Sequence, residues 1–293
     1  MNQKTKGMLC IIFSAFCFAV MNVCIRMAGD VPSMQKSFFR NFLCFFLALI
    51  IMKKQHIGFS GKKGNIGPLL ARSIFGLMGV LCNFYAVDHL VLADASMLNK
   101  MSPFFAILLS FLILKERIKP VQAIAVVGAF VGCLLVIKPT GLNLTRLPAL
   151  IGLMGGFGAG MAYTFVRMLG TQGEKGPFIV SFFSGFSTIV LLPFLIMNYT
   201  PMTGMQLFWL LMTGAAACGG QFGITQAYCY ASAKDISIFD YSQILFSAMF
   251  GLVLFGQIPD GYSILGYIIV CSMAVWMFFY QKQATVKEES GKA

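Results

Sequence analysis

Long apolar runs alternate along the chain with short polar segments. About twenty apolar residues in a helix cross the roughly 30 Å hydrocarbon core of a bilayer. We therefore predict an all-α polytopic membrane protein with ten transmembrane helices. They are expected near residues 7–28, 33–52, 66–87, 93–114, 120–137, 147–168, 177–197, 205–230, 236–255 and 261–280.

The composition supports a membrane protein, because 58% of the 293 residues are hydrophobic and only 11% are charged. The net charge of +12 lies mostly in short segments between the apolar runs. Lysine and arginine in such loops stay on the cytoplasmic side, so they indicate orientation and not nucleic-acid binding. We predict a cell-membrane protein with both termini cytoplasmic, and this assignment places Arg72 at the cytoplasmic side.

Neither cysteine nor histidine forms a pattern typical of a metal or cofactor site. The nine cysteines lie in apolar runs without a C-x-x-C pair, and His56 and His89 are far apart in the sequence. We therefore predict no metal, no cofactor and no enzymatic activity.

Two stretches 141 residues apart resemble each other. Residues 93–119 and 234–260 align without a gap, with Asp94 opposite Asp235 and Ser96 opposite Ser237. Five helices per half is an odd number, so related halves must be inverted relative to each other in the membrane. We predict one repeat at 1–141, an inverted repeat at 142–281 and a disordered cytoplasmic tail at 282–293. Inverted repeats around a central cavity are typical of secondary transporters.

Lys100 and Asp240 lie inside apolar runs, where a charge costs roughly 2.5 to 3.5 kcal/mol and needs a reason. In one interpretation, Lys100 holds an anionic group of the substrate while Asp240 holds a cationic group or a coupling proton, which favours a zwitterionic cargo. In the other, the two pair with each other, or Lys100 reaches the outer interface.

Other polar residues in the apolar runs are candidates for lining a substrate cavity, with hydrogen bonding between helices as the alternative. Asp240 and Gln243 share a helical face, which their repeat counterparts Asn99 and Ser102 match. Arg40 either binds an anion or fixes helix packing. The predicted substrate-binding residues are Asn22, Asn83, Tyr85, Asn99, Lys100, Ser102, Tyr163, Gln226, Asp240, Tyr241 and Gln243.

Small residues predict where helices approach closely. Glycines 152, 156 and 160 repeat every four residues, as do Gly128 and Gly132. Pro103, close to Lys100, is expected to kink the fourth helix.

Two sequence stretches resemble the ten-helix EamA-type members of the drug/metabolite transporter superfamily. They are SFFRNFLCFF at 37–46 and NFYAVDHLVLADASMLNKMSPFFAILLSFLILKERI at 83–118. The resemblance implies ten helices around a central cavity, alternating access by rocking, and export or uptake of small organic metabolites. The second copy departs from the family pattern at Gln257 and Ile244.

Together these features predict a secondary active transporter for a small polar organic metabolite, such as an amino acid, a nucleoside or a vitamin-like compound. The lipid bilayer is its surroundings, a proton is the candidate coupling ion through Asp240, and a homodimer is a candidate assembly. The alternatives are an integral membrane enzyme and a membrane protein that transports nothing.

Overall fold

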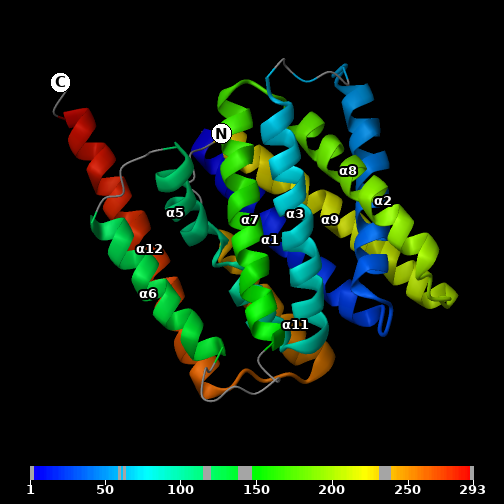
Figure 1. Ribbon diagram of the computed structural model, residues 1–293. Coiled ribbons are helices and arrows are strands. Elements are labelled where there is room, and N and C mark those ends of the chain that lie inside the picture. Colours follow the sequence, from blue (N-terminus) through cyan, green and yellow to red (C-terminus); the bar gives the residue numbers. More distant parts are fainter. Residues whose placement is uncertain are drawn as a thin grey trace.

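Helices make up the regular structure of the chain in a computed structural model that describes residues 3–58, 61, 64–114, 120–137, 147–230 and 239–290 (Figure 1). The first half contains α1 (Gln3–Met27), α2 (Ser33–Lys54), α3 (Ile66–His89), α4 (Leu92–Asn99), α5 (Ser102–Leu114) and α6 (Pro120–Ile137). The second half contains α7 (Leu147–Thr171), α8 (Gly176–Met197), α9 (Gly204–Tyr230), α11 (Ser242–Phe255) and α12 (Gly261–Ser290).

The outer surface of the helical bundle is apolar. Side chains such as Ile74, Ile189, Leu245 and Val253 are more than half exposed, although a soluble protein would bury many of them. Within the described residues, six helices are long and apolar enough to cross a membrane, and three shorter apolar helices accompany them. The fold is that of a multi-pass membrane protein.

The predicted spans agree with the helices, with two differences. The fourth span is divided into α4 and α5, and the beginning of the ninth span lies outside the described residues. The C-terminal segment also differs from expectation, because α12 continues to Ser290 where a disordered tail was predicted from residue 282. The segment contains good helix formers and no glycine or proline before Gly291, which explains the extension.

The fourth span and the ninth span are both broken, and a new helix begins at the equivalent position in each. α4 ends at Asn99 and α5 begins at Ser102, while α11 begins at Ser242 after a turn at Tyr241. Pro103 has no backbone N–H to donate and therefore suits the first turn of α5. The predicted kink of the fourth helix is thus a break, and the register of 141 residues places the two breaks at equivalent points.

The helices pack in pairs that the repeat relates to one another. The repeat relates α1 to α7 and α3 to α9. The packing of α1 against α9 therefore corresponds to the packing of α7 against α3. α2 packs on α8 and α6 on α12, and each of these pairs joins equivalent helices, while α4 packs on α11, so that the fourth span contacts its counterpart, the ninth span. α1 and α7 run in opposite directions (Figure 1). The halves are therefore inverted copies about a pseudo-two-fold axis.

Glycines of α7 bring this helix directly against the break in the fourth span. A Cβ atom on Gly156 would lie 2.5 Å from the carbonyl oxygen of Leu98, and one on Gly160 would lie 2.8 Å from that of Ser102. Gly132 similarly places α6 against the backbone of Gly266 in α12. The predicted close approach at both glycine rows is confirmed.

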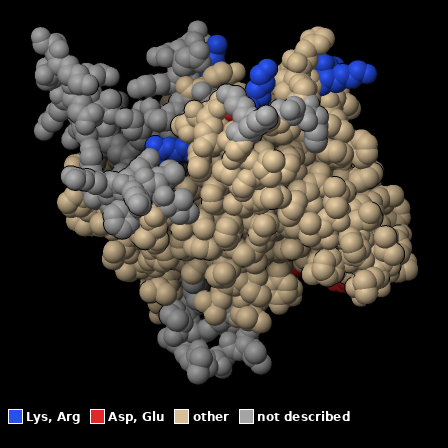
Figure 2. All heavy atoms as spheres, turned by 45° about the horizontal axis from the view of Figure 1, so that its top comes forward, with Lys and Arg blue, Asp and Glu red and all other residues tan. Residues whose placement is uncertain are grey.

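The two chain ends lie at the same end of the bundle (Figure 1). Lysine and arginine side chains gather at that end, as Figure 2 shows, and include the exposed Lys53, Lys54 and Lys175. Asp30 and Asp88 lie at the opposite end, where α1 and α3 finish.

Candidate functional site

A small cavity of about 60 Å³ lies at the centre of the bundle, where both repeats contribute residues. The first repeat lines it from α1, α2, α3 and, in the fourth span, α4, and the second repeat lines it from α7, α8, α9 and, in the ninth span, α11. The polar and charged lining residues are Arg40, Arg72, Asn83, Asn99, Tyr163, Gln221 and Gln243. This position between inverted repeats is where secondary transporters bind their substrates.

Two arginines from antiparallel helices of the first repeat meet in this cavity. Arg40 of α2 is 1% exposed and Arg72 of α3 is 3% exposed. Their guanidinium carbons lie 5.6 Å and 3.7 Å from the centroid of the same ring, Phe183 of α8. The two guanidinium groups are therefore neighbours, since their separation cannot exceed the sum of those distances.

Only part of the hydrogen-bonding capacity of these arginines is used. Arg40 Nη1 donates to Asn41 Oδ1 at 2.6 Å, and Arg72 Nη2 donates to Gln221 Oε1 at 3.3 Å. Arg40 Nε, Arg72 Nε and Arg72 Nη1 are buried without an acceptor among the described residues. Both arginines that line the cavity therefore have N–H groups without an acceptor.

Lys100 and Asp240 form a buried ion pair at the two helix breaks. Lys100 Nζ lies 2.7 Å from Asp240 Oδ1, and the side chains are 2% and 1% exposed. Lys100 follows the last residue of α4, and Asp240 precedes the turn that leads into α11. Each side chain therefore neutralises the other across the two repeats. Of the two interpretations of these residues, this is the one in which they pair with each other.

A chain of buried hydrogen bonds links this region to the cavity wall. Asn83 donates to Asn22 at 3.4 Å, Asn22 donates to Ser96 at 3.3 Å, and the Ser96 hydroxyl donates to Ser247 at 2.6 Å. These residues come from α3, α1, α4 and α11. These bonds join the fourth and ninth spans directly to α1 and α3, which line the cavity.

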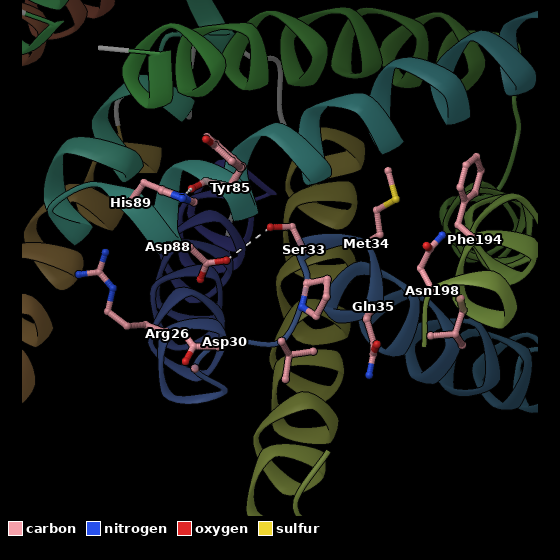
Figure 3. A pocket seen from close by; sticks show the side chains of 14 residues that line it. Arg26, Asp30, Ser33, Met34, Gln35, Tyr85, Asp88, His89, Phe194 and Asn198 are labelled. Carbon is pink, nitrogen blue, oxygen red and sulfur yellow. Dashed lines mark hydrogen bonds between the residues drawn. The ribbon is translucent and has the colours of Figure 1, made fainter. Parts of the chain in front are cut away.

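A larger cavity of about 690 Å³ lies at the end of the bundle opposite the termini (Figure 3). The ends of α1, α3 and α8 and the beginning of α2 surround it. Its polar lining residues are Arg26, Asp30, Ser33, Gln35, Tyr85, Asp88, His89 and Asn198. Arg26 donates to the backbone carbonyls of Val87 and Leu90, which holds the end of α3 against α1.

A second ion pair joins α2 to α3 at the wall of the larger cavity. Lys36 Nζ is 2.6 Å from Asp88 Oδ1, and the Lys36 side chain is fully buried. Gln35 precedes this pair and lines the larger cavity, whereas Arg40, one helical turn further, lines the central one. Along α2, Lys36 thus lies between a residue that lines the larger cavity and one that lines the central cavity.

Four of the residues predicted from the sequence to bind substrate line the central cavity: Asn83, Asn99, Tyr163 and Gln243. Asn22 is fully buried beside them and bonds to Asn83.

The other predicted residues lie elsewhere. Tyr85 lines the larger cavity and stacks on His89. Ser102 and Tyr241 are buried at the helix breaks, where the Tyr241 ring lies 6.2 Å from that of Phe104. Gln226 is half-buried on α9, and Gln221 of the same helix lines the cavity in its place.

Arg72 and Phe183 are two of the residues at the central cavity that the sequence prediction missed. Arg72 was assigned to the cytoplasmic side by the positive-inside rule, yet it is buried in α3. The sequence pattern that could have identified Arg72 is its helical spacing from the other cavity-lining residues of α3. Arg72, Gly76, Gly79 and Asn83 share one face of α3, and all four line the cavity.

The fold and the site define a membrane transporter built from two inverted repeats. Comparison with known proteins agrees: residues 5–138 match the EamA-like transporter family. The chain is 30% identical over 267 residues to the pseudopaline exporter CntI of Pseudomonas aeruginosa, covering 90% of this chain and 93% of that protein. The chain therefore belongs to the EamA-like transporter family of the drug/metabolite transporter superfamily.

More distant relatives extend over the same length. Human solute carrier family 35 member G1 is 24% identical, with 92% of this chain and 78% of that protein aligned. A protein of known crystal structure superimposes with a TM-score of 0.69 at 13% identity, covering 92% of this chain and 96% of the other. The latter similarity supports the fold alone.

Proposed function

We propose that the protein is a secondary active transporter that moves a small polar organic metabolite across the cell membrane by alternating access. The observation that carries this proposal is the central cavity, which equivalent helices of two inverted repeats line with amide, hydroxyl and guanidinium groups. A site on the pseudo-two-fold axis is reached from either side when the repeats rock against each other.

The two ion pairs have separate roles in this proposal. The Lys36–Asp88 pair opens and closes the passage to the larger cavity, because it joins α2 to α3 between the two cavities. The Lys100–Asp240 pair couples the broken helices to each other. Asp240 is also our candidate for proton coupling, since protonation of its carboxylate would release Lys100 and loosen both breaks.

The orientation of the chain is part of the proposal. We place the end that carries the termini and the exposed lysines in the cytoplasm, in accordance with the positive-inside rule. The larger cavity then faces the cell exterior, and the described conformation is open in that direction.

The direct test is solute movement by the purified protein in liposomes. A panel of radiolabelled amino acids, nucleosides, organic acids and amines is offered to preloaded proteoliposomes, with protein-free liposomes as the control. We expect protein-dependent exchange of at least one class of solute, and its loss in Lys100→Ala. Absence of any movement, together with turnover of a lipid-linked substrate, would establish the membrane-enzyme alternative.

A further inference from the structure

The charges that line the central cavity are all positive. Arg40 and Arg72 are the charged residues among its described lining, and a guanidinium group does not lose its proton in a protein. The half-buried carboxylate of Asp88 is neutralised by Lys36, and the buried carboxylate of Asp240 is neutralised by Lys100. The cavity therefore carries two positive charges without a counterion from the described part of the protein.

Such an arrangement is costly in the absence of a ligand. A charge at the depth of a membrane helix carries an insertion cost unless a partner or a ligand compensates it. The Phe183 ring offsets part of this cost, because both guanidinium groups lie over it. The ring supplies no acceptor for the free N–H groups, and three buried guanidinium nitrogens remain without one.

The free groups are those that recognise an oxyanion. A guanidinium group presents its donors in a planar fork that matches the paired oxygens of a carboxylate or a phosphate. Arg72 has Nε and Nη1 unused, one free donor on each of the two edges of its fork, and Arg40 adds Nε. The amide groups of Asn83 and Gln243 line the same cavity and suit uncharged polar parts of a ligand.

On this basis, and resting on the proposed transport function, we propose that the cargo is a small organic anion whose carboxylate or phosphate group binds between Arg40 and Arg72. Lys100 and Asp240 neutralise each other and do not bind the charged groups of the cargo. The substrate class is therefore anionic and not zwitterionic.

The test is ligand-dependent thermal stabilisation of the purified full-length protein. The probes are succinate and inorganic phosphate, and the matched controls are succinamide, which keeps the carbon skeleton of succinate without its charges, and choline. We expect a saturable rise of about 5 °C in melting temperature at a probe concentration a hundredfold above its dissociation constant. Succinamide and choline should leave the melting temperature unchanged.

Variants connect the effect to the two arginines. Arg72→Gln and Arg40→Gln should each weaken probe binding at least tenfold, and Arg72→Lys should weaken it less, because it keeps the charge but not the fork. Arg167→Gln, which removes an exposed arginine of α7, is the control and should bind like the wild type. A response to succinate alone assigns a carboxylate, a response to phosphate alone assigns a phosphate, and a response to both supports the shared chemistry.

The anion site is wrong if neither anion stabilises the protein, or if Arg72→Gln and Arg40→Gln retain the wild-type response. Transport in liposomes separates this failure from failure of the proposed function. Movement of neutral or cationic solutes that is unaffected by Arg72→Gln would overturn the anion site and keep the transporter. Anion binding without movement of any solute would keep the anion site and overturn the proposed transport function.

Discussion

Lys100 and Asp240 are 140 positions apart in the sequence, yet Lys100 Nζ lies 2.7 Å from Asp240 Oδ1. Both residues are at helix breaks that the repeat makes equivalent. Their pairing removes the reason for expecting a cargo with both charges, because each side chain satisfies the other in the described conformation. The pair instead fixes the two breaks to each other at the centre of the protein.

Removing one member of this pair should destabilise the protein strongly. Lys100→Ala leaves the Asp240 carboxylate buried without its partner, and Asp240→Asn leaves the ammonium group. Breaking a buried ion pair in this way typically costs about 3 to 5 kcal/mol. Thermal unfolding in detergent measures the loss as a lower melting temperature.

The charge-swapped double variant, Lys100→Asp with Asp240→Lys, is the control for this prediction. It should melt closer to the wild type than either single variant does, because the attraction is restored. Single variants that melt and transport like the wild type would show that the pair has neither a structural nor a functional role.

Gly156→Ala should separate α7 from the break in the fourth span. The new Cβ atom would lie 2.5 Å from the Leu98 carbonyl oxygen, and this backbone atom cannot move aside without shifting α4. Overpacking of this kind costs about 1 to 3 kcal/mol. Gly170→Ala on the same helix is the matched control, because no atom lies within 4 Å of its added Cβ. Equal melting temperatures for the two variants would contradict the packing role.

Arg72→Gln should stabilise the ligand-free protein or leave its stability unchanged. The substitution removes a buried charge that has no carboxylate partner among the described residues, while glutamine keeps a polar side chain of similar length. Loss of binding without loss of stability is the behaviour of a functional residue that is not optimised for folding. A melting temperature several degrees below that of the wild type would instead assign Arg72 to helix packing.

Asp88→Asn should weaken the contact of Lys36 in α2 with residue 88 in α3. The ammonium group of Lys36 is fully buried and would lose the carboxylate that neutralises it. We expect a lower melting temperature and faster modification of a cysteine introduced at Asn83 by a water-soluble thiol reagent, in a background without native cysteines. The same cysteine with Asp88 intact provides the reference rate, and equal rates would show that the pair does not control access.

The proposed orientation predicts which positions a membrane-impermeant maleimide labels in intact cells. In a cysteine-free background, Asp30→Cys should be labelled directly, because Asp30 lines the cavity opposite the termini. Lys54→Cys lies on the same end as the termini and should be labelled only after the membrane is permeabilised. The opposite pattern would invert the topology.

The arrangement of helices was predictable because length and apolarity are local properties of the sequence. The expected span at 120–137 coincides with α6, and Pro103 marked the region where the fourth span breaks. The extended α12 was missed, since the chain was predicted to be disordered from residue 282. Helix propensity, which favours continuation to Ser290, was the stronger factor.

The site was less predictable because it depends on the direction of side chains from distant segments. Asn99 and Gln243 were found through the repeat, which relates their helical faces. Arg72 was not, because its distance from the end of the apolar run is equally compatible with an interfacial and a buried arginine. Only the packing of α3 against α7 and α8 places it in the cavity.

The contact of α1 with α9 corresponds through the repeat to the contact of α7 with α3. The described conformation therefore predicts a second conformation in which the two repeats have exchanged their internal geometries. If each repeat adopts the present internal geometry of its counterpart, the helix pairs are preserved while the cavity beside Arg26 closes. A cavity of the same form then opens at the end of the bundle that carries the termini, near Arg167, which is the repeat counterpart of Arg26. Because the arginines over Phe183 belong only to the first repeat, the two states offer an anion different surroundings, and their affinities need not be equal.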